Sequence, residues 1–264
     1  MYLHLLTTLH DMQKKMMIIA GETSGDRHAA DLVYELNELD PGIEWVGIGG
    51  EALRQSGTRL LFHLSQLAFL GITEVIGHLP FIRKVFKAVK NELRNGVDAI
   101  ILVDYPGFNL RIARIANRIN IPVIYYISPQ LWAWGEKRVE KMRRYVDLLL
   151  VVFQFEETYY NKFGITAHFV GHPLIDQIKI NHNEDQFRRH NQIPLEKPIL
   201  GLFPGSREME VRKLLPTMVR AAQVLKHKYD CIPAIGCSSH LPRSLYERIV
   251  PQADIQLIES QTHA

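Results

Sequence analysis

Short apolar runs alternate with longer amphipathic segments along most of this chain. The apolar runs predict strands at residues 16–20, 45–48, 99–103, 123–127, 148–152 and 168–170. The amphipathic segments between them predict helices at residues 26–39, 51–56, 80–94, 110–120, 137–145 and 155–163. Strands that alternate with helices pair in parallel through right-handed crossovers. The pattern therefore predicts an α/β fold whose first part is a Rossmann-like domain built on a parallel sheet.

A polar, charged stretch at residues 181–196 interrupts this alternation and indicates a linker or a surface helix. The pattern then resumes, with strands expected at residues 198–203, 232–236 and 255–258 and helices at residues 208–228 and 242–249. A Rossmann-like domain needs several more strands than these three to bury its helices. We therefore expect an N-terminal domain at residues 16–194 and an incomplete second Rossmann-like domain at residues 195–264.

Two consecutive strands of the first domain end in loops rich in polar and aromatic residues. One ends in the sequence DYPGFN at residues 104–109, and the next ends in SPQLWAW at residues 128–134. Ligands of open parallel sheets bind outside the carboxyl ends of the strands. A single Asp after a strand is commonly a turn or capping residue. Two such loops at one edge of the sheet nevertheless favour a binding site there.

Composition narrows the class of protein. Of the 264 residues, 47% are hydrophobic and 22% are charged, which is typical of a globular protein with a sizeable core. The net charge of +3 does not point to a nucleic-acid partner. Cys231 and Cys237 have neither disulfide-framework nor zinc-site spacing, and they suit a reducing cytoplasm.

The sequence also shows neither a membrane span nor a metal motif. Residues 1–15 do not form a clear signal peptide, and no apolar run approaches the roughly 20 residues of a spanning helix. Neither a His-Glu-x-x-His motif nor an acidic metal cluster occurs. We therefore expect no metal and no other cofactor.

Two strand-to-helix junctions offer groups to an anionic or sugar ligand. The sequence GETSGD at residues 21–26 presents free amides at a helix start, although Thr23, Ser24 or Asp26 could equally only cap that helix. The sequence GSR at residues 205–207 offers amides and a guanidinium that suit a diphosphate. Alternatively, the acidic residues that follow it only complement the helix dipole.

Aromatic and histidine side chains add further candidates. Trp132 and Trp134 point the same way if their segment is extended, and aromatic faces stack on sugar rings or fill a core. Ser128 and Gln130 offer hydrogen bonds beside them. His172 is a candidate acid–base catalyst, a role that histidine fills more often than any other residue, but in its Gly-His-Pro setting a structural role in a turn is favoured.

Residues 80–94 predict a basic amphipathic helix. Its apolar stripe comprises Phe81, Ile82, Val85, Phe86, Val89 and Leu93. Its other positions are dominated by Arg83, Lys84, Lys87, Lys90 and Arg94. Together with the apolar stretch at residues 64–79, this helix indicates a membrane-surface element. The alternative is a helix that docks on the sheet and leaves its basic face in solvent.

Five motifs resemble, in chain order, those of the lipid-A-disaccharide synthases. They are GETSGD at residues 21–26, DYPGFN at 104–109, SPQLWAW at 128–134, VGHPL at 170–174 and FPGSR at 203–207. The resemblance extends from about Met16 to about Cys237, and the tryptophan-bearing motif is its most specific part. It implies a GT-B glycosyltransferase that joins UDP-2,3-diacylglucosamine to 2,3-diacylglucosamine 1-phosphate. The products would be lipid A disaccharide 1-phosphate and UDP, with inversion and without a metal.

The resemblance also implies roles for individual residues. Asp104 would be the general base, although Asp104 and Asn109 could instead only bond the turn around Pro106. The acceptor would contact Glu22, Ser24, Gly25, Asp26, Asn109, Gln130, Trp132 and Trp134. The donor would contact Gly205, Ser206, Arg207 and Glu208. The membrane would contact Phe69, Leu70, Phe81, Ile82 and Phe86.

By the same resemblance the protein would be cytoplasmic and would bind peripherally to the inner membrane. It would have no nucleic-acid partner, and whether it forms a homodimer is left open. The family continues into a Gly- and Thr-rich loop and an acidic helix that hold the nucleotide sugar, so we expect a C-terminally truncated chain. One alternative is an inactive remnant that only binds acyl-sugar or membrane. Another is a different GT-B enzyme, such as a 2-epimerase or a peptidoglycan glucosaminyltransferase, against which the tryptophan motif argues.

Overall fold

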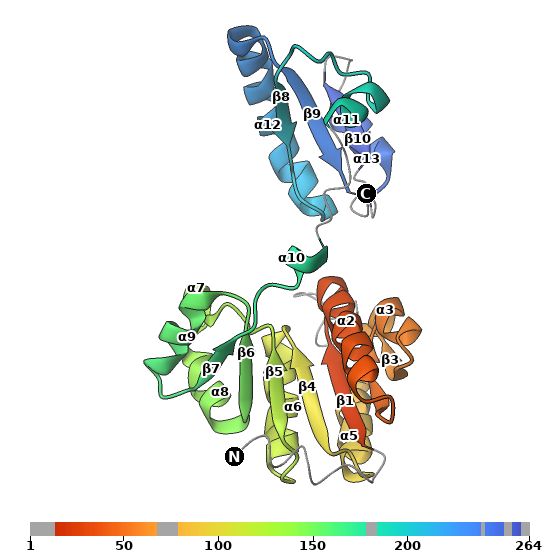
Figure 1. Ribbon diagram of the computed structural model, residues 1–264, viewed down its shortest axis with the longest axis vertical. Helices are drawn as coiled ribbons and strands as arrows, with labels where there is room; N and C mark the ends of the chain where they lie inside the picture. Colours follow the sequence, from red (N-terminus) through yellow and green to blue (C-terminus); the bar gives the residue numbers. More distant parts are fainter. Residues whose placement is uncertain (1–13, 68–78, 178–183, 239–240, 251–254, 260–264) are drawn as a thin grey trace. The chain divides into compact units, whose positions relative to one another are not determined.

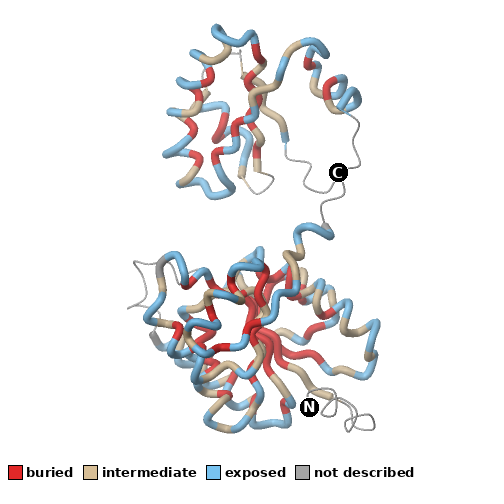
Figure 2. The backbone as a smooth tube through the Cα atoms, turned by 60° about the vertical axis from the view of Figure 1, so that its left-hand side comes forward, coloured by how far each residue is buried: buried red, intermediate tan, exposed pale blue. Residues whose placement is uncertain are grey.

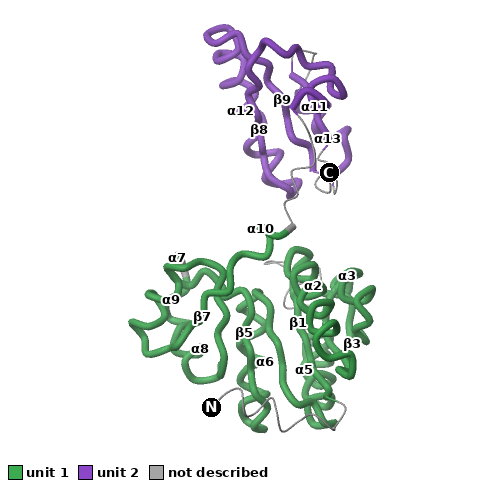
Figure 3. The backbone as a smooth tube through the Cα atoms, viewed as in Figure 1, with its two compact units in different colours: residues 1–176 green, residues 177–264 purple. Residues whose placement is uncertain are grey.

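The chain folds into two compact units, residues 1–176 and residues 177–264 (Figures 1 and 3). The computed structural model describes residues 14–67, 79–177, 184–238, 241–250 and 255–259. Phe69 and Leu70, two of the expected membrane contacts, lie outside these residues.

The first unit is built on a seven-stranded sheet in which every neighbouring pair is parallel. The strands lie in the order β3-β2-β1-β4-β5-β6-β7. Their bounds are β1 Lys15–Ala20, β2 Glu44–Gly49, β3 Arg59–His63, β4 Ala99–Val103, β5 Val123–Tyr126, β6 Leu148–Val151 and β7 Ala167–Phe169. The chain order reverses between β1 and β4, which makes that position the topological switch point of a doubly wound sheet.

Helices cover both faces of this sheet. Their bounds are α2 Thr23–Leu39, α3 Glu51–Gln55, α4 Leu64–Leu67, α5 Leu79–Arg94, α6 Pro106–Asn117, α7 Leu131–Trp134, α8 Val139–Tyr145, α9 Gln154–Asn161 and α10 Leu174–Gln177. A 3₁₀ turn at Glu136–Arg138 precedes α8. The predicted α/β class is thereby confirmed.

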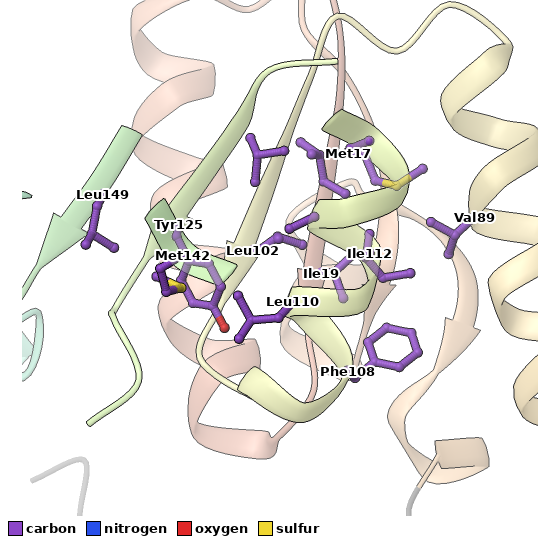
Figure 4. Packing of buried hydrophobic residues seen from close by; sticks show 14 of the residues in the cluster. Met17, Ile19, Val89, Leu102, Phe108, Leu110, Ile112, Tyr125, Met142 and Leu149 are labelled. Atoms are coloured by element: carbon purple, nitrogen blue, oxygen red, sulfur yellow. The ribbon is translucent and has the colours of Figure 1, made fainter. Parts of the chain in front are cut away.

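Alternate side chains of the central strands enter two different cores, as the pleat requires. Met17 and Ile19 of β1 join a core with α5, α6, α8 and α9, part of which Figure 4 shows. Ile18 and Ala20, between them, join a second core with α2 and α3. The central strands β1, β2 and β4 are accordingly the most deeply buried strands of this unit (Figure 2).

Three local features differ from the expected elements. The strand β3 was not predicted, because its apolar run covers only Leu60–Phe62 and is flanked by polar residues. The helix α6 begins at Pro106 rather than at residue 110, since proline at the first helical position has a suitable φ and needs no N–H partner. Residues 131–134 form the short helix α7. An extended segment, the condition under which both tryptophans would point the same way, is therefore not what forms here.

The apolar stripe of α5 faces the sheet, so the docked alternative for this helix is correct. Val85 and Val89 are 0% exposed within the core. Phe86 lies 4.9 Å from Phe108, between ring centroids, and Phe81 packs edge-on against Phe62 at 5.7 Å. Phe81 and Phe86 are therefore partly buried core residues, and Ile82 beside them is half-buried. The expected membrane contacts of these three side chains are therefore replaced by contacts within the protein.

The second unit contains a three-stranded parallel sheet in the order β10-β9-β8. Its elements are α11 Glu184–His190, β8 Ile199–Leu202, α12 Glu208–Tyr229, β9 Ile232–Cys237, α13 Arg243–Ile249 and β10 Gln256–Glu259. The apolar sides of α12 and α13 pack on this sheet to form a separate core.

The division between the units falls between Asp176 and Gln177 rather than at residue 194. The reason lies in α11, which we expected to be a linker or surface helix. Its buried Arg188 donates hydrogen bonds of 2.8 Å to the carbonyl oxygens of Pro194 and Lys197. Those bonds tie α11 to the segment that leads into β8, so the helix belongs to the second unit.

Among the helices that the structure describes, none combines the length and the apolar character needed to cross a membrane. Within the described ranges, no group of three or more His, Cys, Asp or Glu side chains is arranged to hold a metal ion.

Candidate functional site

The loops that contain the GETSGD and DYPGFN motifs meet at the switch point of the first sheet. Strands β1 and β4 are paired neighbours, with Ala20 opposite Val103. The residues that follow them, Glu22 and Asp104, therefore reach the same carboxyl edge. The charge of Glu22 acts on the Asp104 carboxyl, so the structure brings together two residues that are far apart in the sequence.

The backbone at this edge is strained. Asp104 and Tyr105 have φ values of 45° and 46°, and Ile127 at the end of β5 has a φ of 59°. The left-handed region is uncommon for residues other than glycine and is a genuine outlier for a β-branched residue such as isoleucine. Each such residue costs about 1–3 kcal/mol, and such strain clusters at active sites and ligand clamps. The strain marks the ends of β4 and β5 as a candidate active site.

Neighbouring side chains hold the strained Asp104 backbone in place. Asn109, which is 0% exposed, donates through Nδ2 to the carbonyl oxygens of Val103 at 3.1 Å and of Asp104 at 2.8 Å. The Tyr125 hydroxyl donates to the same Asp104 oxygen at 2.5 Å. Asn109 thus supports the loop from inside the fold, as the alternative interpretation of this motif proposed for it.

The surroundings of Asp104 favour its protonated form. Burial raises the pKa of its carboxyl above the ordinary value, and the Glu22 carboxylate raises it further. A hydrogen bond from the Tyr105 amide opposes both effects by stabilising the charged form. A carboxylate with a raised pKa binds a proton more readily, which is the property a general base requires.

One glycine of the GETSGD motif leaves room for the loop that contains Asp104 and Tyr105. A Cβ placed on Gly21 would lie 2.2 Å from Cδ1 of the Tyr105 ring, closer than any non-bonded contact allows. The absence of a side chain at residue 21 therefore lets Tyr105, and with it the Asp104 loop, pack against the end of β1.

Other polar residues of the same motif have different positions. The Asp26 carboxylate is buried and accepts backbone N–H groups of Gly50 at 2.5 Å, Ala52 at 3.0 Å and Leu53 at 3.3 Å. It caps α3 rather than its own helix, so we assign it a structural role. Ser24 is exposed in the first turn of α2, and Gly25 is buried close to Val103.

The second candidate loop, residues 128–134, is held by a helix that sequence reasoning did not connect with it. Glu156 of α9 is 1% exposed and accepts the indole Nε1–H of Trp132 at 3.2 Å. Tyr160, one turn further along α9, lies 2.7 Å from the Ser128 hydroxyl and donates to the Pro129 carbonyl at 3.1 Å. Burial raises the pKa of both Glu156 and Tyr160.

Exposed rings continue from this loop along the edge of the sheet. Trp132, which is 40% exposed, meets Phe155 edge-on at 5.1 Å, and Phe155 stacks on Phe153 at 5.7 Å. Phe153 lies 5.6 Å from the ring of His172. We call these four residues the aromatic row.

Two further residues lie here, His28 near the aromatic row and Gln130 within the loop at residues 128–134. His172 accepts the Leu174 amide through Nδ1 at 3.2 Å, which agrees with the structural turn role favoured for it. Its ring meets that of the buried His28 edge-on at 6.1 Å. Burial and the neighbouring His172 lower the pKa of His28. Gln130 is exposed at the start of α7.

The GSR motif lies in the second unit, directly before the 22-residue helix α12. Gly205 has a φ of 109°, and a Cβ there would lie 2.4 Å from Glu210 Oε2. Arg207 is the N-cap residue of α12, and its amide donates to the Glu210 carboxylate at 3.3 Å. Ser206 is exposed, and Glu208 pairs with Arg212 at 2.7 Å.

The doubly wound sheet of the first unit, the loops at its switch point and the second α/β unit together define the class of protein. It is a GT-B-like α/β fold with a candidate site at the switch point of the first sheet. Among solved structures, an S. aureus MnaA–UDP complex resembles the chain with a TM-score of 0.61 and 14% identity, over 94% of this chain and 69% of that one. A Neisseria meningitidis UDP-GlcNAc 2-epimerase bound to UDP-GlcNAc gives 0.59 and 12%, over 94% and 72%. At such low identity, these likenesses show the fold alone.

Sequence comparison narrows the class to one family. Residues 16–259 match the family model described as lipid-A-disaccharide synthetase. The chain is 41% identical to the lipid-A-disaccharide synthase of Trichlorobacter lovleyi over 223 residues, and 43% identical to lipid-A-disaccharide synthase 1 of Legionella pneumophila (strain Philadelphia 1) over 213 residues. The chain belongs to the lipid-A-disaccharide synthase family. The matches cover 84% and 80% of this chain but only 57% and 56% of those relatives.

Proposed function

We propose that this chain serves in the transfer of a diacylglucosamine unit from UDP-2,3-diacylglucosamine to 2,3-diacylglucosamine 1-phosphate. Its first unit would hold the acceptor, and its second unit would supply the phosphate contacts of the donor. The observation that carries the proposal is Asp104, a carboxylate with a raised pKa on a strained turn at the switch point. Membership of the family supports the substrate classes.

In the proposed reaction, Asp104 takes the proton of the attacking acceptor hydroxyl as the new glycosidic bond forms. The bond between the donor sugar and UDP breaks on the opposite face of the anomeric carbon, which inverts its configuration. Arg207 and the amides at the start of α12 would offset the charge that develops on the UDP leaving group. Contacts to the acceptor are proposed for Glu22, Ser24, Gly25, Gln130, Trp132 and Trp134.

A reconstituted enzyme tests this function directly. Because the matched relatives are longer, the assay uses the chain fused to the C-terminal remainder of the Trichlorobacter lovleyi relative, with UDP-2,3-diacylglucosamine and radiolabelled acceptor. We expect labelled disaccharide and free UDP. Acceptor binding without any product would favour a binding role, and epimerisation of a UDP-sugar would favour the 2-epimerase alternative. For a protein of these 264 residues alone, calorimetry should show weak UDP binding, because the contacts proposed for the GSR motif are to phosphate alone.

The raised pKa of Asp104 predicts a particular pH dependence. The base works only when ionised, so kcat/KM should fall as the pH drops through its pKa, at a higher pH than for an ordinary Asp near 3.9. Because the Glu22 charge contributes to that rise, Glu22→Gln should move the acid limb to lower pH. A pH profile of both enzymes measures this shift. An unchanged or upward-shifted limb would contradict the assignment.

We further propose that the protein associates peripherally with the cytoplasmic face of the inner membrane through the basic face of α5. Arg83, Lys84, Lys87 and Lys90 are all exposed on this face. A basic residue near an anionic bilayer contributes about 1 kcal/mol, so replacing Lys84, Lys87 and Lys90 by Gln should weaken vesicle binding by about 10²–10³-fold.

Sedimentation with phosphatidylglycerol-containing vesicles at low and high salt measures this effect, since screening should also release the parent protein. The matched control replaces the exposed lysines Lys137, Lys141 and Lys162 of the same unit by Gln, which changes the net charge equally. Equal losses in both triple variants would show that net charge alone, and not α5, is responsible.

A further inference from the structure

The loop after β5 depends on the helix that follows the next strand. Glu156 and Tyr160 lie four residues apart on α9, so they project from one face of that helix. Tyr160 bonds the Ser128–Pro129 part of the loop, and Glu156 bonds Trp132. The position of the loop is therefore set from α9 and not by the loop residues alone.

The two oxygens of Glu156 have different partners. Oε2 accepts the backbone N–H of Phe153 at 3.1 Å and closes the first turn of α9. Oε1 accepts the Trp132 indole N–H at 3.2 Å and lies 3.5 Å from the Ser128 hydroxyl. Capping α9 requires only one of these oxygens, so the second oxygen has a separate task at the loop.

A carboxylate suits this task better than a neutral amide. A glutamine has one acceptor oxygen and an NH₂ group that only donates. It would leave either Phe153 N–H or Trp132 Nε1–H facing another donor. Burying a carboxylate is unfavourable unless its hydrogen bonds are made, and here the bonds from Phe153 and Trp132 compensate for that burial.

The Trp132 ring held in this way is half in solvent. Its indole N–H points to the buried Glu156, its ring makes a T-shaped contact with Phe155, and 40% of the residue remains exposed. An indole with one anchored end and an open surface forms a rigid platform for an apolar or sugar ligand. Phe155 and Phe153 extend that surface along the aromatic row.

We propose that Glu156 is a positioning residue for the acyl-sugar acceptor, which it orients through the hydrogen bond to the Trp132 indole. The inference rests on the proposed function, because it takes the acceptor to be a diacylated sugar phosphate. Glu156 itself does not touch the ligand. Its contribution is to fix the plane of the ring on which the ligand lies.

The hydrogen bond is tested first, by nitrogen-15 NMR of the indole groups in the 264-residue chain. The chain has three tryptophans, and Trp132→Phe assigns the signal of Trp132. Glu156→Gln should shift that signal and speed its exchange with solvent. The matched control is Glu157→Gln, at the next position, where the carboxylate accepts the Phe169 amide at 2.7 Å instead. An unmoved Trp132 signal in Glu156→Gln would overturn the proposal.

Ligand binding is tested next, with soluble 2,3-dihexanoylglucosamine 1-phosphate as the probe. Glu156→Gln and Trp132→Phe should each weaken binding about tenfold. The double variant should bind the probe no more weakly than the single variant with the lower affinity, because both substitutions remove the same interaction. Glu157→Gln should bind like the parent.

The outcomes separate the two proposals. Multiplicative losses in the double variant, or parent-like binding by Glu156→Gln, would overturn the positioning role while leaving the acceptor site in place. No binding of the probe by the parent chain would overturn the proposed acceptor site, and the positioning role with it.

Discussion

Replacement of Asp104 by Asn should lower kcat for disaccharide formation by about 10²–10⁴-fold, the usual loss when a general base is removed. An amide cannot take the proton of the attacking hydroxyl at neutral pH. Its oxygen can still accept the Tyr105 amide, and the repulsion from Glu22 disappears. The variant should therefore fold normally, with a melting temperature equal to or slightly above that of the parent.

Rate and melting temperature measured together in the reconstituted enzyme check this result. Asp98→Asn is a matched control at the amino end of the same strand, where the carboxylate accepts the Lys15 amide at 2.7 Å. It should leave the rate unchanged. Near-parental turnover by Asp104→Asn would reject Asp104 as the base and leave it as a turn residue.

Substitution of Gly21 by Ala should lower activity by about 10²-fold, the effect of a displacement of about 1 Å at a catalytic group. The added Cβ would lie 2.2 Å from the Tyr105 ring. The ring must move, and Tyr105 is bonded in sequence to Asp104 in a backbone that is already strained. The loss should appear mainly in kcat.

Gly107→Ala supplies the control for this change. Gly107 lies in the first turn of α6, and a Cβ there would meet nothing within 4 Å. Alanine is preferred to glycine in a helix by about 1 kcal/mol, so this variant should be equally or more stable and should keep its activity. Equal activity in Gly21→Ala and the parent would show that the Tyr105 ring adapts without moving Asp104.

Most of the fold could be predicted because its elements are locally encoded. The runs at residues 99–103 and 123–127 are apolar throughout, as is typical of parallel strands buried on both faces. The missed strand β3 has a weaker local signal, and it forms at the sheet edge by pairing with β2. Its existence depends on pairing with β2, which the five residues of the strand do not encode by themselves.

The α5 stripe shows a different limit. A core and a bilayer both select apolar residues at helical spacing, so Phe81 and Phe86 look the same in either case. Only the contacts with Phe62 of β3 and Phe108 of α6 decide that these rings pack against the core.

The candidate site likewise has some features that the sequence predicts and others that only the structure shows. The sequence alone was sufficient to place Asp104 at the end of a parallel strand and GETSGD after another, because strand-to-helix junctions are local features. It also carried the motifs of the family, which the family match supports. The strand order then follows from pairing, and pairing brought Glu22 beside Asp104.

The partners of the buried polar groups were decided only by the tertiary structure. Asp26 caps α3, and Glu156 holds Trp132. A carboxylate or amide in a motif has the same chemistry whether it meets a ligand or a backbone group. Which of these it meets depends on residues tens of positions away, because a buried polar group bonds whatever partner the packing of the whole chain places beside it.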